Sequence, residues 1–158
     1  MNKSKETWRI IDVLNWSKKF LKDKGIENPQ IEIEWILREV LDYSRLDVYM
    51  NHERPLEPDE LKKIREYLKR RANNEPLSYI FGYTEFMGLK FYLSENVLIP
   101  RDETEILVEK LLQIYSGNNN ENLKILDIGT GSGNIIISLI KNLNNAKGTA
   151  IDYNKKAL

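Results

Sequence analysis

The sequence predicts an α+β protein that begins with a helical bundle, continues through a β-hairpin and ends in the start of a parallel α/β sheet. Three observations predict it. Apolar residues in the first half recur every three or four positions, the period of helices. From Tyr79 the chain is rich in aromatic and β-branched residues, which favour strands. A strand, a glycine loop and a helix then follow from Lys124. We therefore expect a helical domain at 1–78, a hairpin connector at 79–100 and an incomplete α/β domain at 101–158.

Composition excludes several classes of protein. The 158 residues are 41% hydrophobic and 30% charged, which is typical of a soluble globular chain. Apolar runs fall far short of the ~20 residues that span a bilayer, and the first residues lack the apolar segment of a secretory signal, so we expect a cytoplasmic protein without membrane contact. Basic and acidic residues number 24 each, which argues against direct binding of nucleic acid by charge alone.

The residues that carry common catalytic chemistry are scarce. Cysteine is absent, which removes thiolate nucleophiles and cysteine zinc sites. His52 is the only histidine, and we interpret it as a surface residue in a polar stretch. No metal site is expected.

Three helices are expected before residue 73. The first ends near Gly25, a common helix stop, the second starts at Pro29, and the third has Pro58 in its first turn. Their expected apolar faces are Trp8, Ile11, Leu14, Phe20 and Leu21; Ile33, Ile36, Leu37, Val40 and Leu41; and Leu61, Ile64, Tyr67 and Leu68. The basic cluster 69–71 could meet phosphates, but we favour a solvated helix end that offsets the helix dipole.

The second half opens with short strands or a hairpin within 79–100. A helix follows, in which Asp102 and Glu105 have the spacing of a capping box. Its buried stripe is expected to be Leu107, Val108, Leu111, Leu112 and Tyr115. Asn118–Asn122 is expected to be a polar loop.

The segment 124–128 is short and apolar, which predicts a buried, parallel strand. Gly129-Thr130-Gly131-Ser132-Gly133 and a helix come next, and "GTAIDY" predicts a second strand that ends in Asp152. Glycines let the backbone approach a ligand closely, and the helix start presents free N–H groups. Asp152 follows Asp127 at about the spacing of a carboxylate that binds ribose hydroxyls. A plain turn between strand and helix would not need both acids.

The glycine spacing separates two kinds of nucleotide cofactor. A dinucleotide loop has the pattern G-x-G-x-x-G, whereas this chain has D-x-G-x-G-x-G. The pattern resembles motif I of the S-adenosylmethionine-dependent methyltransferases, which have a Rossmann-like sheet. Asp127 suits a cofactor with a cationic end and would repel an anionic pyrophosphate.

The segment 75–109 resembles the signature of the protein glutamine methyltransferases that act on peptide chain release factors. The family pattern runs roughly P-L-x-Y-I-x-G, then E-F, then P-R-P-[DE]-T-E. The matching residues are Pro76, Leu77, Tyr79, Ile80, Gly82, Glu85, Phe86, Pro100, Arg101, Glu103, Thr104 and Glu105. Asp102 stands where the family usually has proline, and since both suit a helix start we expect a small effect.

The resemblance implies a role for each part of the site. Gly129 to Gly133 would hold the methionine end of S-adenosylmethionine, Asp127 would lie beneath it, and Asp152 would bind the ribose. Arg101 and Thr104 would line the cofactor or substrate pocket, although Arg101 could equally brace the helix start through Glu105. The helical bundle would contact the release factor, whose Gly-Gly-Gln glutamine is the methyl acceptor.

The family's catalytic stretch, Asn-Pro-Pro-Tyr, does not occur in this sequence. We therefore expect the N-terminal part of a longer enzyme, with no catalytic residue present and no methyl transfer by these residues alone. Three alternatives stay open. They are a methyltransferase for another protein or a nucleic-acid amine, a non-catalytic module that binds release factor, and a dinucleotide oxidoreductase.

Overall fold

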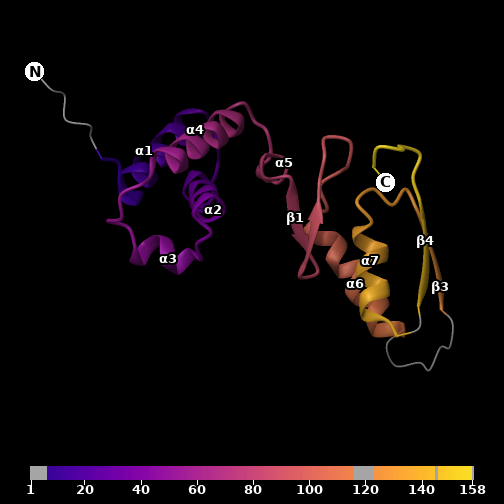
Figure 1. The fold of residues 1–158 in the computed structure, drawn as a ribbon. Coiled ribbons are helices and arrows are strands. Elements are labelled where there is room, and N and C mark those ends of the chain that lie inside the picture. Colours follow the sequence, from indigo (N-terminus) through magenta and orange to yellow (C-terminus); the bar gives the residue numbers. More distant parts are fainter. Residues whose placement is uncertain (1–6, 116–122, 145, 158) are drawn as a thin grey trace, which may run out of the picture. The chain divides into compact units, whose positions relative to one another are not determined.

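A computed structural model describes residues 7–115, 123–144 and 146–157, which fold as helices with four short strands (Figure 1). The predicted α+β class is therefore confirmed. The chain divides into two compact units, Met1–Ile80 and Phe81–Leu158. The expected loop Asn118–Asn122 lies outside the described residues.

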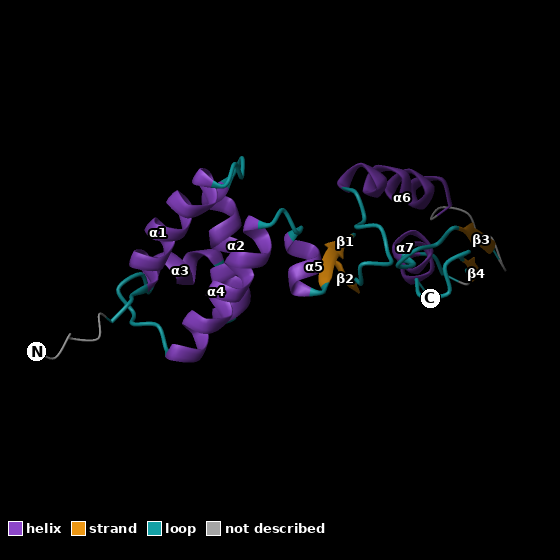
Figure 2. Cartoon of the chain, turned by 90° about the horizontal axis from the view of Figure 1, so that it is seen from above, coloured by secondary structure: helices purple, strands orange, loops and turns teal. Residues whose placement is uncertain are grey.

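The first unit contains α1 (Ile10–Asp23), α2 (Pro29–Leu41), α3 (Arg45–Met50) and α4 (Pro58–Ala72). Helix α2 packs against each of the other three, and Figure 2 shows the same helices from above. The predicted apolar face of α2 is confirmed at Ile33, Ile36 and Leu37, which have no exposed surface. The core is completed by Ile10, Val13, Leu14, Leu21, Val48, Ile64 and Leu68.

Helix α1 ends as predicted but buries a different face. Gly25 has φ +80°, and the Gly25 and Ile26 amides donate to the Lys22 and Leu21 carbonyls, 2.9 and 3.1 Å away. This pair of bonds is a Schellman motif. The buried residues are Ile10, Val13, Leu14, Ser17 and Leu21. Trp8, Ile11 and Phe20 are only half-buried, so the predicted stripe was wrong at these three positions.

Helix α4 buries the predicted face but departs from the prediction at its basic end. Ile64, Tyr67 and Leu68 are buried as expected. The basic end, however, is not simply solvated, because Arg70 donates to the Glu75 carboxylate at 2.8 Å and Arg71 donates to Glu32 at 2.8 Å. Arg70 and Arg71, two of the three residues of this cluster, therefore join α4 to Glu75 and to α2.

The connector contains a helix as well as a hairpin. Helix α5 (Leu77–Phe81) occupies the start of the segment expected to form strands, and β1 (Tyr83–Phe86) and β2 (Leu89–Tyr92) then pair antiparallel. Met87 and Gly88 form the two-residue turn with φ +50° and +68°, the backbone that a tight hairpin requires.

The second unit continues with α6 (Asp102–Tyr115), β3 (Lys124–Ile128), α7 (Asn134–Asn142) and β4 (Lys147–Ile151). Its core joins the hairpin to both helices through Phe86, Phe91, Val108, Leu139 and Leu143. On α6, Leu111 and Leu112 pack against this core, but Leu107 and Tyr115 are exposed, so the predicted stripe was too wide.

Strand β3 is parallel to β4 as predicted, but it is not buried. Ile125 packs against the core, whereas Leu126 and Ile128 on the opposite face are 60% and 73% exposed. Alternate residues of a strand point to opposite faces, and in the described residues the helices cover only one of them. The sequence of β3 is typical of a strand buried on both faces, but in the described residues its sheet is covered on one face only.

Candidate cofactor-binding site

The candidate site lies where β3 and β4 end and α7 begins (Figure 1). Gly129, Gly131 and Gly133 have φ values of +79°, +55° and +75°. Side chains other than glycine rarely adopt this region. The alternating glycines predicted from the motif therefore serve the backbone path of the loop, and they leave its surface without side chains at three positions.

Backbone hydrogen bonds fasten the loop to the end of β4. The amides of Gly129 and Thr130 both donate to the Ile151 carbonyl, at 2.8 and 3.0 Å. The Gly133 amide donates to the Thr130 carbonyl at 2.9 Å, which closes the turn into α7. The first amides of α7 have no acceptor within the helix, as at any helix start, and are available to a ligand.

The two predicted acids hold the loop from both sides. Asp127 accepts a hydrogen bond from the Thr130 hydroxyl at 2.8 Å, and Asp152 accepts one from the Gly131 amide at 2.8 Å. The structure thus brings Asp127, the glycine loop and Asp152 together. Thr130 is 6% exposed, so its side chain braces Asp127 from within. The Ser132 hydroxyl donates to the Asn134 side-chain oxygen at 3.2 Å, at the start of α7.

Asp152 is held as an anion by backbone amides. Hydrogen bonds from the amides of Gly131 and Asn154 lower the pKa of its carboxyl below the ordinary aspartate value. Each carboxylate oxygen accepts one of these bonds, and each can accept another. The carboxylate can therefore also accept hydrogen bonds from two neighbouring hydroxyl groups of a ligand.

Two residues that the sequence analysis missed border the loop. Val97 is 6% exposed, and its Cγ1 lies 3.7 Å from the position that a Cβ on Gly131 would take. Asn154 donates from its side chain to the Asn96 carbonyl at 3.1 Å. The Val97 contact joins positions 34 residues apart (131 − 97 = 34) and the Asn154 bond joins positions 58 residues apart, which no local pattern reveals. The sequence did contain a signal for the position of Asn154, because Asp152 and Asn154 form an Asp-x-Asn turn after β4.

Arg101 and Thr104 are less closely tied to the site. The Thr104 amide donates to the Arg101 carbonyl at 2.9 Å, within the first turn of α6. Within the described ranges, neither side chain has a hydrogen bond or ion pair, so their place in a pocket stays a prediction. Helix α6 begins at Asp102. The Glu105 carboxylate accepts a hydrogen bond from the Met87 amide at 2.5 Å. The expected capping box and the alternative brace from Arg101 are therefore replaced by a bond to the hairpin turn.

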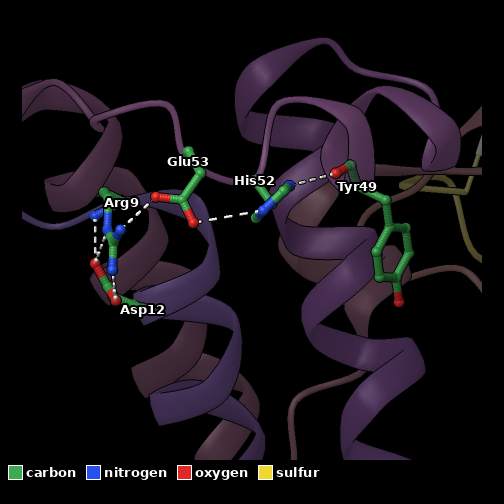
Figure 3. A network of polar contacts seen from close by, with 5 residues as sticks. All are labelled: Arg9, Asp12, Tyr49, His52 and Glu53. Atoms are coloured by element: carbon green, nitrogen blue, oxygen red, sulfur yellow. Dashed lines mark hydrogen bonds and ion pairs between the residues drawn. The ribbon is translucent and has the colours of Figure 1, made fainter.

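His52 belongs to a surface network in the first unit (Figure 3). Its Nδ1 lies 2.8 Å from the Tyr49 carbonyl, and its Nε2 lies 3.4 Å from Glu53. Arg9 binds both Glu53 and Asp12, and the bonds from Arg9 lower the pKa of the Asp12 carboxyl. The network fastens the start of α1 to the loop before α4, and the ring is about half-exposed, as the sequence analysis expected.

The described residues offer neither a metal site nor a membrane-spanning helix. In the described part of the chain, no group of three or more His, Cys, Asp or Glu side chains is placed to hold a metal ion. No helix among the same residues is both long and apolar enough to cross a membrane.

Fold and site together define the class. A parallel strand–glycine loop–helix–strand unit with an acid at the end of each strand, in the same chain as a separate helical unit, defines an α+β protein. Comparisons with known proteins then identify the family. Residues 12–82 match the family described as PrmC N-terminal domain.

Curated relatives match most or all of the chain. A release factor glutamine methyltransferase of Geobacter sulfurreducens is 40% identical over 158 residues, which is 100% of this chain and 54% of the relative. Proteins of the same name from Fusobacterium nucleatum and Chlorobaculum tepidum are 42% and 36% identical, over 94% and 97% of this chain and 42% and 53% of theirs. The chain belongs to the release factor glutamine methyltransferase family, and it spans about half the length of these relatives.

Proposed function

We propose that this chain is part of an S-adenosylmethionine-dependent enzyme that methylates the side-chain amide nitrogen of the glutamine in the Gly-Gly-Gln loop of peptide chain release factors. The observation that carries the proposal is the pair of acids on either side of the glycine loop. The chain's curated relatives are named release factor glutamine methyltransferases. In this proposal the helical domain at 1–78 recognises the substrate, and the hairpin at 79–100 connects it to the start of a Rossmann-like domain at 101–158. The protein is proposed to be cytoplasmic.

The residues present fit S-adenosylmethionine. The three glycines leave the loop backbone open, and Asp152 keeps acceptor capacity for ribose hydroxyls. Asp127 places a carboxylate beneath the loop, where it would favour a cationic group over an anionic phosphate. When bound, the cofactor supplies a methyl group on a positively charged sulfur. Arg101 and Thr104 remain candidates for the wall of the pocket.

The proposed contribution of these residues is binding and orientation. An amide nitrogen is a weak nucleophile, so the reaction depends on holding nitrogen and methyl carbon in line. The residues of this chain hold the methyl donor, whereas the stretch that would orient the glutamine is not in this sequence. We therefore propose that the purified 158-residue chain does not transfer methyl groups. Radiolabelled methyl appearing on release factor would contradict this.

Cofactor binding provides the direct test. We expect the chain to bind S-adenosylmethionine in isothermal titration and to prefer it to NAD. Asp152→Asn should weaken binding about tenfold or more, because loss of a charge-assisted hydrogen bond costs about 1.5–3 kcal/mol. Asp23→Asn, which removes an exposed acid of α1, is the matched control and should leave the affinity unchanged. Equal affinities of the two variants, or tighter binding of NAD, would overturn the cofactor assignment.

A further inference from the structure

A groove of about 370 Å³ runs between α1 and α4 in the first unit, where the two helices pack side by side. The helices α1 and α4 are labelled in Figures 1 and 2. Apart from two cations, its lining is almost wholly apolar and aromatic. The volume falls in the range of sites that hold one or two large side chains or a small ligand.

Three aromatic rings form one wall. Trp8 and Trp16 meet edge to face at 6.3 Å between ring centroids, and Trp16 stacks on Phe20 at 5.1 Å with 9° between the planes. Trp16 is nevertheless 51% exposed. Rings that are already stacked lose little side-chain freedom when a partner covers them, and tryptophan is prominent among residues that dominate binding energy.

The α4 side of the groove carries unpaired positive charge. Arg65 and Lys69 lie one turn apart in its lining. Neither has a hydrogen bond or an ion pair among the described residues. Arg70 and Arg71, only a few positions away, are paired with Glu75 and Glu32. No acidic residue lines the groove.

We propose that this groove is a docking site for a segment of a partner protein that carries a bulky apolar side chain flanked by carboxylates. The aromatic wall would cover the apolar side chain, and Arg65 and Lys69 would pair with the carboxylates. Charge complementarity selects this occupant, because a basic or neutral segment would leave the two cations unpaired. A nucleic acid is a poorer fit, because two cations provide too few phosphate contacts. The proposal is independent of the cofactor site.

The probe is a synthetic helical peptide with leucine or phenylalanine at positions i, i+3, i+4 and i+7 and glutamate elsewhere. Its counterpart has lysine in place of every glutamate. The chain has three tryptophans, so Trp35→Phe leaves Trp8 and Trp16, both in the groove, as the only indole reporters. We expect the acidic peptide to change their fluorescence saturably, and the basic peptide to bind about tenfold more weakly or not at all, since 1.4 kcal/mol is a factor of ten.

Matched variants locate the binding. Arg65→Glu combined with Lys69→Glu should weaken the acidic peptide and strengthen the basic one. Arg38→Glu makes the same change at an exposed arginine of α2 outside the groove and should alter neither affinity. Trp16→Ala should abolish binding and Trp16→Phe should restore much of it, with circular dichroism confirming that each variant is helical.

Several results would overturn the proposal. They are equal binding of the two peptides, an effect of Arg38→Glu as large as that of the double variant, and no fluorescence change at saturating acidic peptide. Sedimentation showing a dimer that Trp16→Ala dissociates would instead assign the groove to a second copy of the chain. None of these results depends on whether S-adenosylmethionine binds.

Discussion

Glu34 is a carboxylate whose side chain is only 3% exposed. Burial alone would raise its pKa, but hydrogen bonds from Tyr49 and Gln30 and the nearby Arg45 guanidinium outweigh burial and leave the pKa lowered. The Arg45 Nε lies 2.9 Å away and the Gln30 Nε2 2.7 Å away. The hydrogen bond between Tyr49 and Glu34 also raises the pKa of the Tyr49 hydroxyl. Glu34 thereby fastens α3 to α2, since Tyr49 and Arg45 both belong to α3.

This arrangement predicts a pH dependence of stability. A free glutamate titrates near pH 4.3, and the folded Glu34 titrates lower, so its contribution is full above about pH 4.3 and is lost as pH falls through the folded value. Glu34→Gln should lower the free energy of unfolding at pH 7 by about 1–3 kcal/mol and flatten its fall on acidification. Urea unfolding from pH 7 to about pH 3 measures both effects. The exposed Glu27→Gln is the control, and parallel curves for wild type and Glu34→Gln would refute the idea.

Individual residues of the site were predictable to different degrees. Asp127 and Asp152 follow from their places at the ends of two consecutive strands, because the ends of parallel neighbours meet at one edge of a sheet. The inward role of the Thr130 hydroxyl was not predictable, because a motif does not show which way a side chain points. Asn154 and Val97 depend on contact with a distant segment, which the sequence alone does not reveal.

Among the elements, long periodic helices were predicted well and short ones were not. Helix α3 was missed because six residues cannot show a helical period. Its start was nevertheless marked, since Ser44 and Asp47 form a capping box, with the Asp47 amide 3.1 Å from the Ser44 hydroxyl. Strand β3 was identified correctly but its burial was not, because an apolar strand sequence does not state how many neighbours the strand has.

The packing of β4 on α7 depends on Gly148. A Cβ built there would lie 2.3 Å from Ile140 Cδ1 and 2.7 Å from Ile136 Cδ1. Ile136 is 3% exposed and has little room to move. The absent side chain therefore allows helix and strand to approach closely.

Gly148→Ala should destabilise the second unit by about 1–3 kcal/mol, the usual cost of overpacking. Thr149→Ala, at the neighbouring exposed position, should cost less than about 0.5 kcal/mol. Thermal unfolding of both variants measures the difference. Equal stabilities would show that Ile136 and Ile140 rearrange without cost.

At the scale of the whole molecule, the described residues leave one face of the β3–β4 sheet uncovered. Ile128 and Ile151 pair in register there, 73% and 46% exposed, with Leu126 beside them at 60%. Parallel sheets are normally covered on both faces, and contiguous apolar surface of this kind favours association.

We expect the chain to associate as its concentration rises, and Ile128→Lys to reduce that association. Met50→Lys introduces the same charge at a 71% exposed residue of α3 and serves as the control. Sedimentation velocity over a range of concentrations measures the effect. Association that both variants reduce equally would point to net charge as the cause.

The two sheets also differ in how much chain must come together before they can form. In the hairpin, Phe86 pairs with Leu89, three residues later in the chain. In the parallel sheet, Lys124 pairs with Lys147, which is 23 residues later (147 − 124 = 23). The helical unit is built from neighbouring segments and is complete by residue 80. Contacts distant in sequence form more slowly than local ones, and chains fold from the N-terminus during synthesis. On the ribosome, we expect a folded helical unit to precede an interval in which β3 has emerged without its partner strand, and that interval is when the nascent chain most needs protection by chaperones.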